Sequence, residues 1–284
     1  MIFIKKYIKQ TLVLIKRFSL FSLDTVLMIF FALFNLMKYK KLFDDDIVFV
    51  TAAEENYYIK VQSLLNSYFK NLNNKLVLYD LGLKPDQIIN LKKSYSDLEI
   101  RKFQFDKFPK FIGTFHDDKL GSYAWKPIIV DHVLNEFKCK VVWLDAGNVI
   151  NKKVVFLKIA LTSKKFISPL SSNTIKDWTH PSTFKYISIK DKYLTSPNYA
   201  SGLISFDYKN EKSKRLSNEW KLFSEIEDCI APIGSSRDNH RQDQTILTLL
   251  IYKNLIKNKI QQLTYPRTNF SLGINFHGKK IYNF

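Results

Sequence analysis

A chain of 284 residues is long enough to bury a large hydrophobic core, and an apolar content of 46% excludes a chain that is disordered throughout. The two cysteines, Cys139 and Cys229, form neither a metal-binding motif nor a disulfide framework, so we expect two packed thiols. The formal net charge of +18 calls for an anionic partner or surface. Its lysines are spread along the chain rather than gathered as in a nucleic-acid reader, so no nucleic-acid partner is expected.

Residues 1–43 form a basic, apolar segment that differs from the rest of the chain. It holds eight Lys or Arg residues and one acid, Asp24, and residues 18–37 are long enough to span a bilayer. Asp24 argues against a clean spanning helix. A signal anchor, a peripheral amphipathic helix and a helical hairpin packed on the domain remain open. We expect one of the first two, and hence a membrane surface as a partner, on a side that the basic flanks leave undefined.

From residue 44 to residue 284 the pattern alternates between strands and helices. The expected strands are short continuous apolar runs, at residues 47–50, 76–79, 98–105 and 141–144. The expected helices lie between them, at residues 54–70, 85–93 and 124–137. This alternation predicts an α/β fold with a mostly parallel, Rossmann-like central sheet.

The second half of the chain is less regular. We expect strands at 166–169 and 203–206 and helices at 218–226 and 242–256. A loop of about thirty residues separates the two strands, and loops of that length in a compact domain are usually functional or disordered. The aromatic residues in this loop favour a functional role.

Polar or small residues stand where three of the expected parallel strands end. Thr51 and Ala52 follow the first strand, Asp80 the second and Asp145 the fourth. In doubly wound sheets, ligands bind beyond the carboxyl ends of the strands. We therefore expect these residues to converge on one ligand.

Asp145 is followed by Ala146 and Gly147, whose small size lets a ligand approach the backbone closely. A carboxylate in this position suits a divalent cation that bridges a diphosphate. A turn or helix-cap aspartate has the same local pattern, so both interpretations stay open at this point.

Two neighbouring motifs resemble the GT-A glycosyltransferases. They are similar to a poorly characterised family with a Trp-Leu-Asp-Ala-Gly variant of the Asp-X-Asp motif, and more distantly to glycogenin-like transferases. The motifs are Tyr123-Ala124-Trp125-Lys126-Pro127 and Trp143-Leu144-Asp145-Ala146-Gly147. The resemblance implies a GT-A-like single domain over residues 44–284. It also implies transfer of a sugar from a nucleoside-diphosphate sugar, expected to be UDP-linked, to a glycan, lipid-linked or protein acceptor.

The same resemblance implies a set of functional residues. Asp243 or Gln244 would act as the catalytic group. In an inverting enzyme a carboxylate must deprotonate the acceptor hydroxyl, whereas in a retaining enzyme a polar residue near the anomeric carbon is enough. Apart from the resemblance, we expect Trp178 and His180 of the long loop to stack on and bond to an acceptor sugar, with packing in the core as the alternative. The donor-binding residues would be Thr51, Ala52, Asp80, Lys126, Asp145, Ala146, Gly147, Ser201, Gly202 and Lys279.

A divalent cation, Mn or Mg, would be held by Asp145 and His277 according to this resemblance. Gly147, however, stands where the motif usually has its second acid. The alternative is a cation-free enzyme in which basic residues meet the diphosphate, drawn from Lys126, Arg237, Arg241 and Lys279.

Two other function classes remain open. The missing second acid is compatible with a non-catalytic, membrane-associated protein that binds nucleotide sugars. A nucleotidyltransferase is disfavoured, because the segment after the first strand lacks glycine and carries the two acids Glu54 and Glu55.

Overall fold

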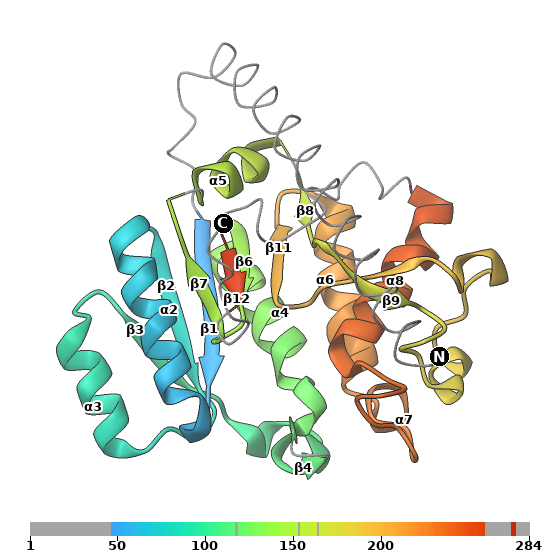
Figure 1. Ribbon diagram of the computed structural model, residues 1–284, viewed down its shortest axis with the longest axis horizontal. Coiled ribbons are helices and arrows are strands. Elements are labelled where there is room, and N and C mark those ends of the chain that lie inside the picture. Colours follow the sequence, from blue (N-terminus) through green and yellow to red (C-terminus); the bar gives the residue numbers. More distant parts are fainter. Residues whose placement is uncertain (1–46, 117–118, 153, 164, 259–273, 277–284) are drawn as a thin grey trace, which may run out of the picture.

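The computed structural model describes residues 47–116, 119–152, 154–163, 165–258 and 274–276 (Figure 1). The predictions for residues 1–43, His277 and Lys279 therefore lie outside the described residues. Across the described part of the chain, no helix combines the length and the apolar character needed to cross a bilayer. Cys139 and Cys229 are buried thiols outside any disulfide, as expected.

A six-stranded sheet forms the centre of the structure, in the order β3-β2-β1-β6-β11-β8. Four strands run parallel: β1 (Ile47–Ala53), β2 (Lys75–Asp80), β3 (Glu99–Lys102) and β6 (Lys140–Leu144). Strand β11 (Leu203–Asp207) is antiparallel to both β6 and β8 (Phe166–Ile167). The expected α/β fold with a mostly parallel central sheet is confirmed.

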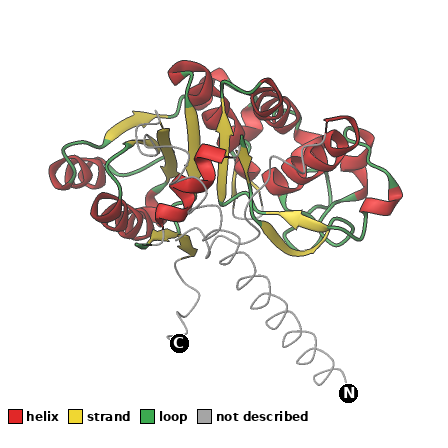
Figure 2. Ribbon diagram, turned by 90° about the horizontal axis from the view of Figure 1, so that it is seen from above, coloured by secondary structure: helices red, strands yellow, loops and turns green. Residues whose placement is uncertain are grey.

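Helices cover both faces of this sheet (Figures 1 and 2). In β1, Val48 and Val50 pack into one core cluster while Ile47 and Phe49 pack into the other, because successive strand residues point to opposite faces. The first cluster includes residues of α4 (Trp125–Phe137), α6 (Glu211–Ser224) and α8 (Gln242–Asn258). The second includes residues of α2 (Tyr58–Asn71), α3 (Pro85–Ser94) and α5 (Val154–Ser163).

Several elements differ from their expected bounds. The strand expected at 98–105 ends at Lys102 and is followed by the 3-10 helix η2 (Phe105–Lys107). The helix expected at 218–226 begins earlier, at Glu211, because the Asn210 side chain accepts a hydrogen bond from the Ser213 backbone N–H and caps it. Helices α5 and α7 (Glu227–Ile230) were not expected.

The long loop before β11 is built from short elements. Strands β9 (Leu170–Thr174) and β10 (Pro197–Tyr199) pair antiparallel, and the 3-10 helices η5 (Pro181–Lys185) and η6 (Asp191–Tyr193) lie between them. The remaining short elements are η1 (Glu55–Tyr57), η3 (Lys110–Gly113), β4 (Phe115–His116), β5 (Lys119–Leu120), η4 (Gly121–Tyr123), β7 (Asn148–Ile150) and β12 (Ile274–Phe276).

The sheet has a switch point between β1 and β6. From β1 the chain proceeds outward through β2 to β3, and it then returns to place β6 on the other side of β1. Chain connections leave such a point in opposite directions and open a crevice at the carboxyl ends of the two strands. Ala53 ends β1 at this switch point, and Asp145 directly follows β6.

Candidate active site

Lys126 is a buried lysine in the first turn of α4, beside the switch point. Its side chain is only 4% exposed. Pro127 is tolerated next to it, because backbone N–H groups in the first turn of a helix have no partner within that helix. Burying an ammonium group costs free energy unless the charge is paired, so we describe the site from the partners of Lys126.

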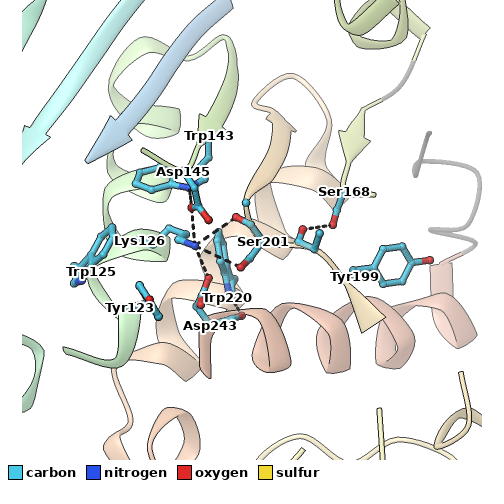
Figure 3. Close-up of polar contacts among 12 residues, drawn as sticks. Tyr123, Trp125, Lys126, Trp143, Asp145, Ser168, Tyr199, Ser201, Trp220 and Asp243 are labelled. Carbon is cyan, nitrogen blue, oxygen red and sulfur yellow. Dashed lines mark hydrogen bonds and ion pairs between the residues drawn. The ribbon is translucent and has the colours of Figure 1, made fainter. Parts of the chain in front are cut away.

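Two carboxylates from distant parts of the chain pair with Lys126 (Figure 3). Its Nζ lies 3.0 Å from Asp145 Oδ1 and 3.0 Å from Asp243 Oδ2. The same Nζ is 3.4 Å from both the carbonyl oxygen and the hydroxyl of Ser201, to which it donates. The structure therefore brings together four residues for which the sequence predicted donor-binding or catalytic roles.

The two carboxylates differ in their exposure to solvent. The Asp145 side chain is 39% exposed, whereas that of Asp243 is 4% exposed. Burial raises the pKa of Asp243, although the Lys126 ammonium opposes this. Burial alone would lower the pKa of Lys126, but the two carboxylates outweigh it and raise that pKa. With all three groups ionised, the cluster carries one net negative charge, and Asp145 is its accessible member.

Asp145 is oriented by its neighbours along the chain and across the sheet. The Trp143 Nε1–H donates to Asp145 Oδ1 over 2.7 Å. The Asp145 backbone N–H donates to the Gly202 carbonyl over 3.0 Å, and the Asn148 side-chain amide donates to the same oxygen over 2.6 Å. Gly202 thus serves the site through its carbonyl, while Ala146 is buried and Gly147 leaves open space where a side chain would be.

Asp243 reaches the cluster from the start of α8. Its backbone carbonyl accepts a hydrogen bond of 2.8 Å from Trp220 Nε1 of α6. Gln242, directly before it, has φ of 41°, a left-handed conformation that is unfavourable for a residue other than glycine. Gln244 is half-buried, and its Nε2 has no hydrogen-bond partner among the described residues. The bend at Gln242 is the type of local strain that proteins retain at functional sites.

A second strained segment precedes Lys126. Gly121, Ser122 and Tyr123 have φ values of 52°, 48° and 64°, so three consecutive residues are left-handed. Only glycine suits the first position, because an added Cβ would collide with the Ile112 carbonyl group. The turn places the Tyr123 ring 5.3 Å from Lys126 Nζ, measured to the ring centroid. Burial raises the pKa of Tyr123, which keeps the phenol neutral.

The residues predicted at the ends of β1 and β2 lie at the neighbouring strand ends. Thr51 and Ala52 are buried within β1, and the Thr51 hydroxyl has no hydrogen-bond partner among the described residues. Asp80 Oδ1 accepts hydrogen bonds from the backbone N–H groups of Gly82, over 2.8 Å, and Leu83, over 2.6 Å. Asp80 thus closes its own turn.

The residues predicted to contact an acceptor lie in the loop between β9 and η5. Trp178 is buried, with the Arg241 guanidinium carbon 4.2 Å from its ring centroid. His180 is half-buried, and its Nδ1 accepts a hydrogen bond from the Ser182 backbone N–H. Its own backbone N–H donates to Nδ1 of the buried His240 over 3.3 Å.

The described residues supply few ligands for a divalent cation. Asp145 Oδ1 is shared by Trp143 and Lys126, and Gly147 offers no side chain. The buried Asn148 Oδ1 lacks a partner among the described residues, but an amide oxygen adds no charge. Within this part of the chain, no three His, Cys, Asp or Glu side chains gather closely enough to hold a metal ion. These residues therefore do not by themselves fit a cation.

Two contributions to the site were not expected from the sequence. Trp143 orients Asp145, and strand alternation contained a signal for it, since residues two apart on a strand point to the same side. Lys126 was expected to meet the donor, but it pairs with both acids. Local sequence held no signal for that pairing, because the three residues lie far apart in the chain.

Three comparisons relate the chain to known proteins. A family model described as "Protein of unknown function (DUF1647)" matches residues 7–131. The search of curated proteins found no match. Among solved structures, the apo WbbM bifunctional glycosyltransferase is 15% identical with a TM-score of 0.49, over 75% of this chain. This chain spans only 39% of the WbbM chain.

Two further solved structures are similar at comparable levels. The galactosyltransferase LgtC, in complex with donor and acceptor sugar analogs, is 15% identical with a TM-score of 0.48, over 82% of this chain and 87% of that one. Core-mannan synthase A of Aspergillus fumigatus, in its Mn/GDP form, is 8% identical with a TM-score of 0.48, over 73% of this chain and 69% of that one. Likenesses this weak establish neither the activity nor the substrates of this chain.

Proposed function

We propose that the chain is a glycosyltransferase with a GT-A-like fold that uses a nucleoside-diphosphate sugar, UDP-linked in our hypothesis. The observation that carries the proposal is the Lys126-bridged pair of Asp145 and Asp243 at the carboxyl end of β6. Crevices at such switch points bind nucleotides in α/β folds. The sequence motifs around Lys126 and Asp145 resemble the same enzyme class.

In this proposal the cluster holds the donor sugar through its hydroxyl groups. Carboxylates accept hydrogen bonds from hydroxyls, and Asp145 is the exposed one. The buried Lys126 keeps Asp145 and Asp243 close together despite their like charges. The raised pKa of Asp243 makes it a stronger base than an ordinary aspartate, which suits a group that accepts the proton of the acceptor hydroxyl.

The diphosphate needs positive charge that this cluster does not provide. Lys126 is already matched by two carboxylates, so the net charge of the three groups repels a diphosphate. The other candidates are a divalent cation at Asp145 and His277, the lysine at 279, and the two arginines Arg237 and Arg241. Both His277 and Lys279 follow β12, whose last residue, Phe276, pairs with Asn148 close to Asp145 in the chain.

Calorimetry with UDP tests the proposal directly. We expect UDP to bind, and comparing Mn²⁺ with EDTA separates a cation-dependent enzyme from a cation-free one. The absence of UDP binding under every metal condition would refute the proposal. Donor hydrolysis and sugar transfer that are both unchanged in Asp145→Ala would instead support the non-catalytic binding protein. The motivating observation for that alternative is Gly147 in the position of the second acid.

A membrane surface and a glycan, lipid-linked or protein acceptor complete the proposal. The motivation for the membrane is the basic, apolar segment 1–43. Sedimentation of the full chain with anionic vesicles is the test. Release by high salt would indicate a peripheral helix, release only by detergent a spanning anchor, and no sedimentation would refute membrane association.

A further inference from the structure

Two arginines lie close to the proposed site. Arg237 lies in the connection between α7 and α8, and Arg241 directly precedes α8. Figure 1 shows α7 at the end of the molecule toward which β1 points, with α4 between it and β2. The Arg237 Nη1–H donates to the Tyr123 hydroxyl over 3.4 Å, and the Tyr123 ring in turn contacts Lys126. Tyr123 thus stands between this pair and the Lys126 cluster.

Arg241 is held in place by an aromatic ring and a backbone hydrogen bond, and its buried Nε has no carboxylate partner among the described residues. Its guanidinium lies over the Trp178 ring, and its backbone N–H donates to the Thr245 hydroxyl over 2.9 Å. The Arg241 Nε is buried and has no hydrogen-bond partner among the described residues. Burial lowers the pKa of Arg241 and the nearby Arg237 lowers it further, while the neighbouring Asp238 opposes both effects.

Other unpaired polar groups lie near Arg241, in the loop that contains Trp178 and in the connection between α7 and α8. The hydroxyls of Thr179 and Ser235 are buried and have no partner within the described part of the chain. The segments meet where the His180 backbone N–H donates to His240 Nδ1. Buried hydroxyls and guanidinium N–H groups are donors that an anion satisfies, and leaving them unpaired costs free energy.

We propose that Arg237 and Arg241 form a subsite for an anionic group of the acceptor, a phosphate or a carboxylate. Guanidinium groups bind both anions through paired, charge-assisted hydrogen bonds. The inference rests on the proposed function for its assignment to the acceptor. A donor with its nucleoside at the end of β1 and its sugar at Lys126 has its diphosphate between them. A group that reaches beyond Tyr123 therefore belongs to the other substrate.

The test measures binding of inorganic phosphate to the full chain by calorimetry, without any donor. We expect Arg237→Gln and Arg241→Gln each to weaken phosphate binding about tenfold, because each removes one charge-assisted contact. Arg215→Gln is the matched control, since Arg215 is exposed on α6 and pairs with Glu219. If Arg241→Gln fails to fold, Arg237→Gln still tests the subsite, because Arg237 is exposed and its replacement should not disturb folding. A parallel titration with glucuronate identifies which anion is preferred.

UDP titrations of the same variants separate the subsite from the donor site. We expect UDP affinity to change less than about twofold. Equal loss of phosphate and UDP binding would overturn the inference, because the pair would then hold the donor diphosphate. Phosphate and glucuronate binding that is unchanged in both variants, or absent from the wild type, would also overturn it. Phosphate bound through the two arginines by a chain that never binds UDP would support the anion subsite and refute only the proposed function.

Discussion

Two strand ends in this molecule have nearly the same sequence pattern but different surroundings. Asp80 ends β2 and Asp145 follows β6, and each is followed two residues later by glycine. The Asp80 carboxylate accepts hydrogen bonds from the backbone of its own turn. The Asp145 carboxylate meets Lys126, which also binds Asp243. A strand-end aspartate thus joins a charged cluster only where other elements bring charged partners to it.

The largest expected effect comes from removing the lysine that distinguishes Asp145 from Asp80. Lys126→Met leaves the buried Asp243 carboxylate uncompensated, and we expect the free energy of unfolding to fall by about 3–5 kcal/mol. Urea denaturation measures this loss, and Lys126→Arg, which keeps the charge, should lose less. Equal stability of Lys126→Met and the wild type would mean that the ion pairs do not support the site.

The start of α8, which brings Asp243 to the cluster, depends on the neutral form of His240. Its Nε2–H donates to the Ile230 carbonyl, its Nδ1 accepts from His180, and burial lowers its pKa from 6.5 to about 4. Because the pKa of His240 is lower in the folded state than in the unfolded state, the folded protein is most stable above pH 6.5. This stability is lost as the pH falls toward the folded-state pKa. We therefore expect the free energy of unfolding to fall by about 3 kcal/mol between pH 6.5 and pH 4.

Denaturation of wild type and His240→Gln across that pH range checks this expectation. The variant should lack this part of the pH dependence. The difference in unfolding free energy between wild type and variant should therefore become smaller as the pH falls. A constant difference would show that His240 does not titrate in this window.

The third prediction tests Asp145 itself. Asp145→Asn keeps the oxygen that accepts from Trp143 but removes the charge, and we expect donor hydrolysis to fall about 100-fold. The free energy of unfolding should change by no more than about 1 kcal/mol, because the side chain is partly exposed. A variant that loses stability but keeps its hydrolysis rate would assign Asp145 the same structural role as Asp80.

The smallest effect is expected at Asp80. Asp80→Ala removes the acceptor of two backbone hydrogen bonds and should cost about 1–2 kcal/mol in unfolding free energy. Asp80→Asn retains an oxygen there and should cost less. UDP affinity should stay within about twofold of wild type in Asp80→Asn. A larger loss of affinity would place Asp80 against the donor, as the sequence predicted, and would remove the contrast with Asp145.

The strands of the parallel half were predictable because their signal is local. The apolar runs at 47–50, 76–79 and 141–144 correspond to β1, β2 and β6 within a few residues. Buried parallel strands are apolar on both faces, so their sequence shows them directly. In contrast, α6 begins seven residues before its expected start, at Glu211 rather than residue 218. Its charged first turn carries no apolar periodicity.

The sequence by itself determined the type of fold, the buried strands and the choice of Asp145 as a candidate site residue. The hydrophobic pattern and the position of a strand end can both be recognised from neighbouring residues in the sequence. Only the tertiary structure decided that Lys126, Asp145, Ser201 and Asp243 share one cluster while Asp80 does not. Pairing of charges depends on which helices the sheet topology brings to each strand end. The physical reason is that burial makes an unpaired charge costly, and partners that remove this cost come from anywhere in the chain.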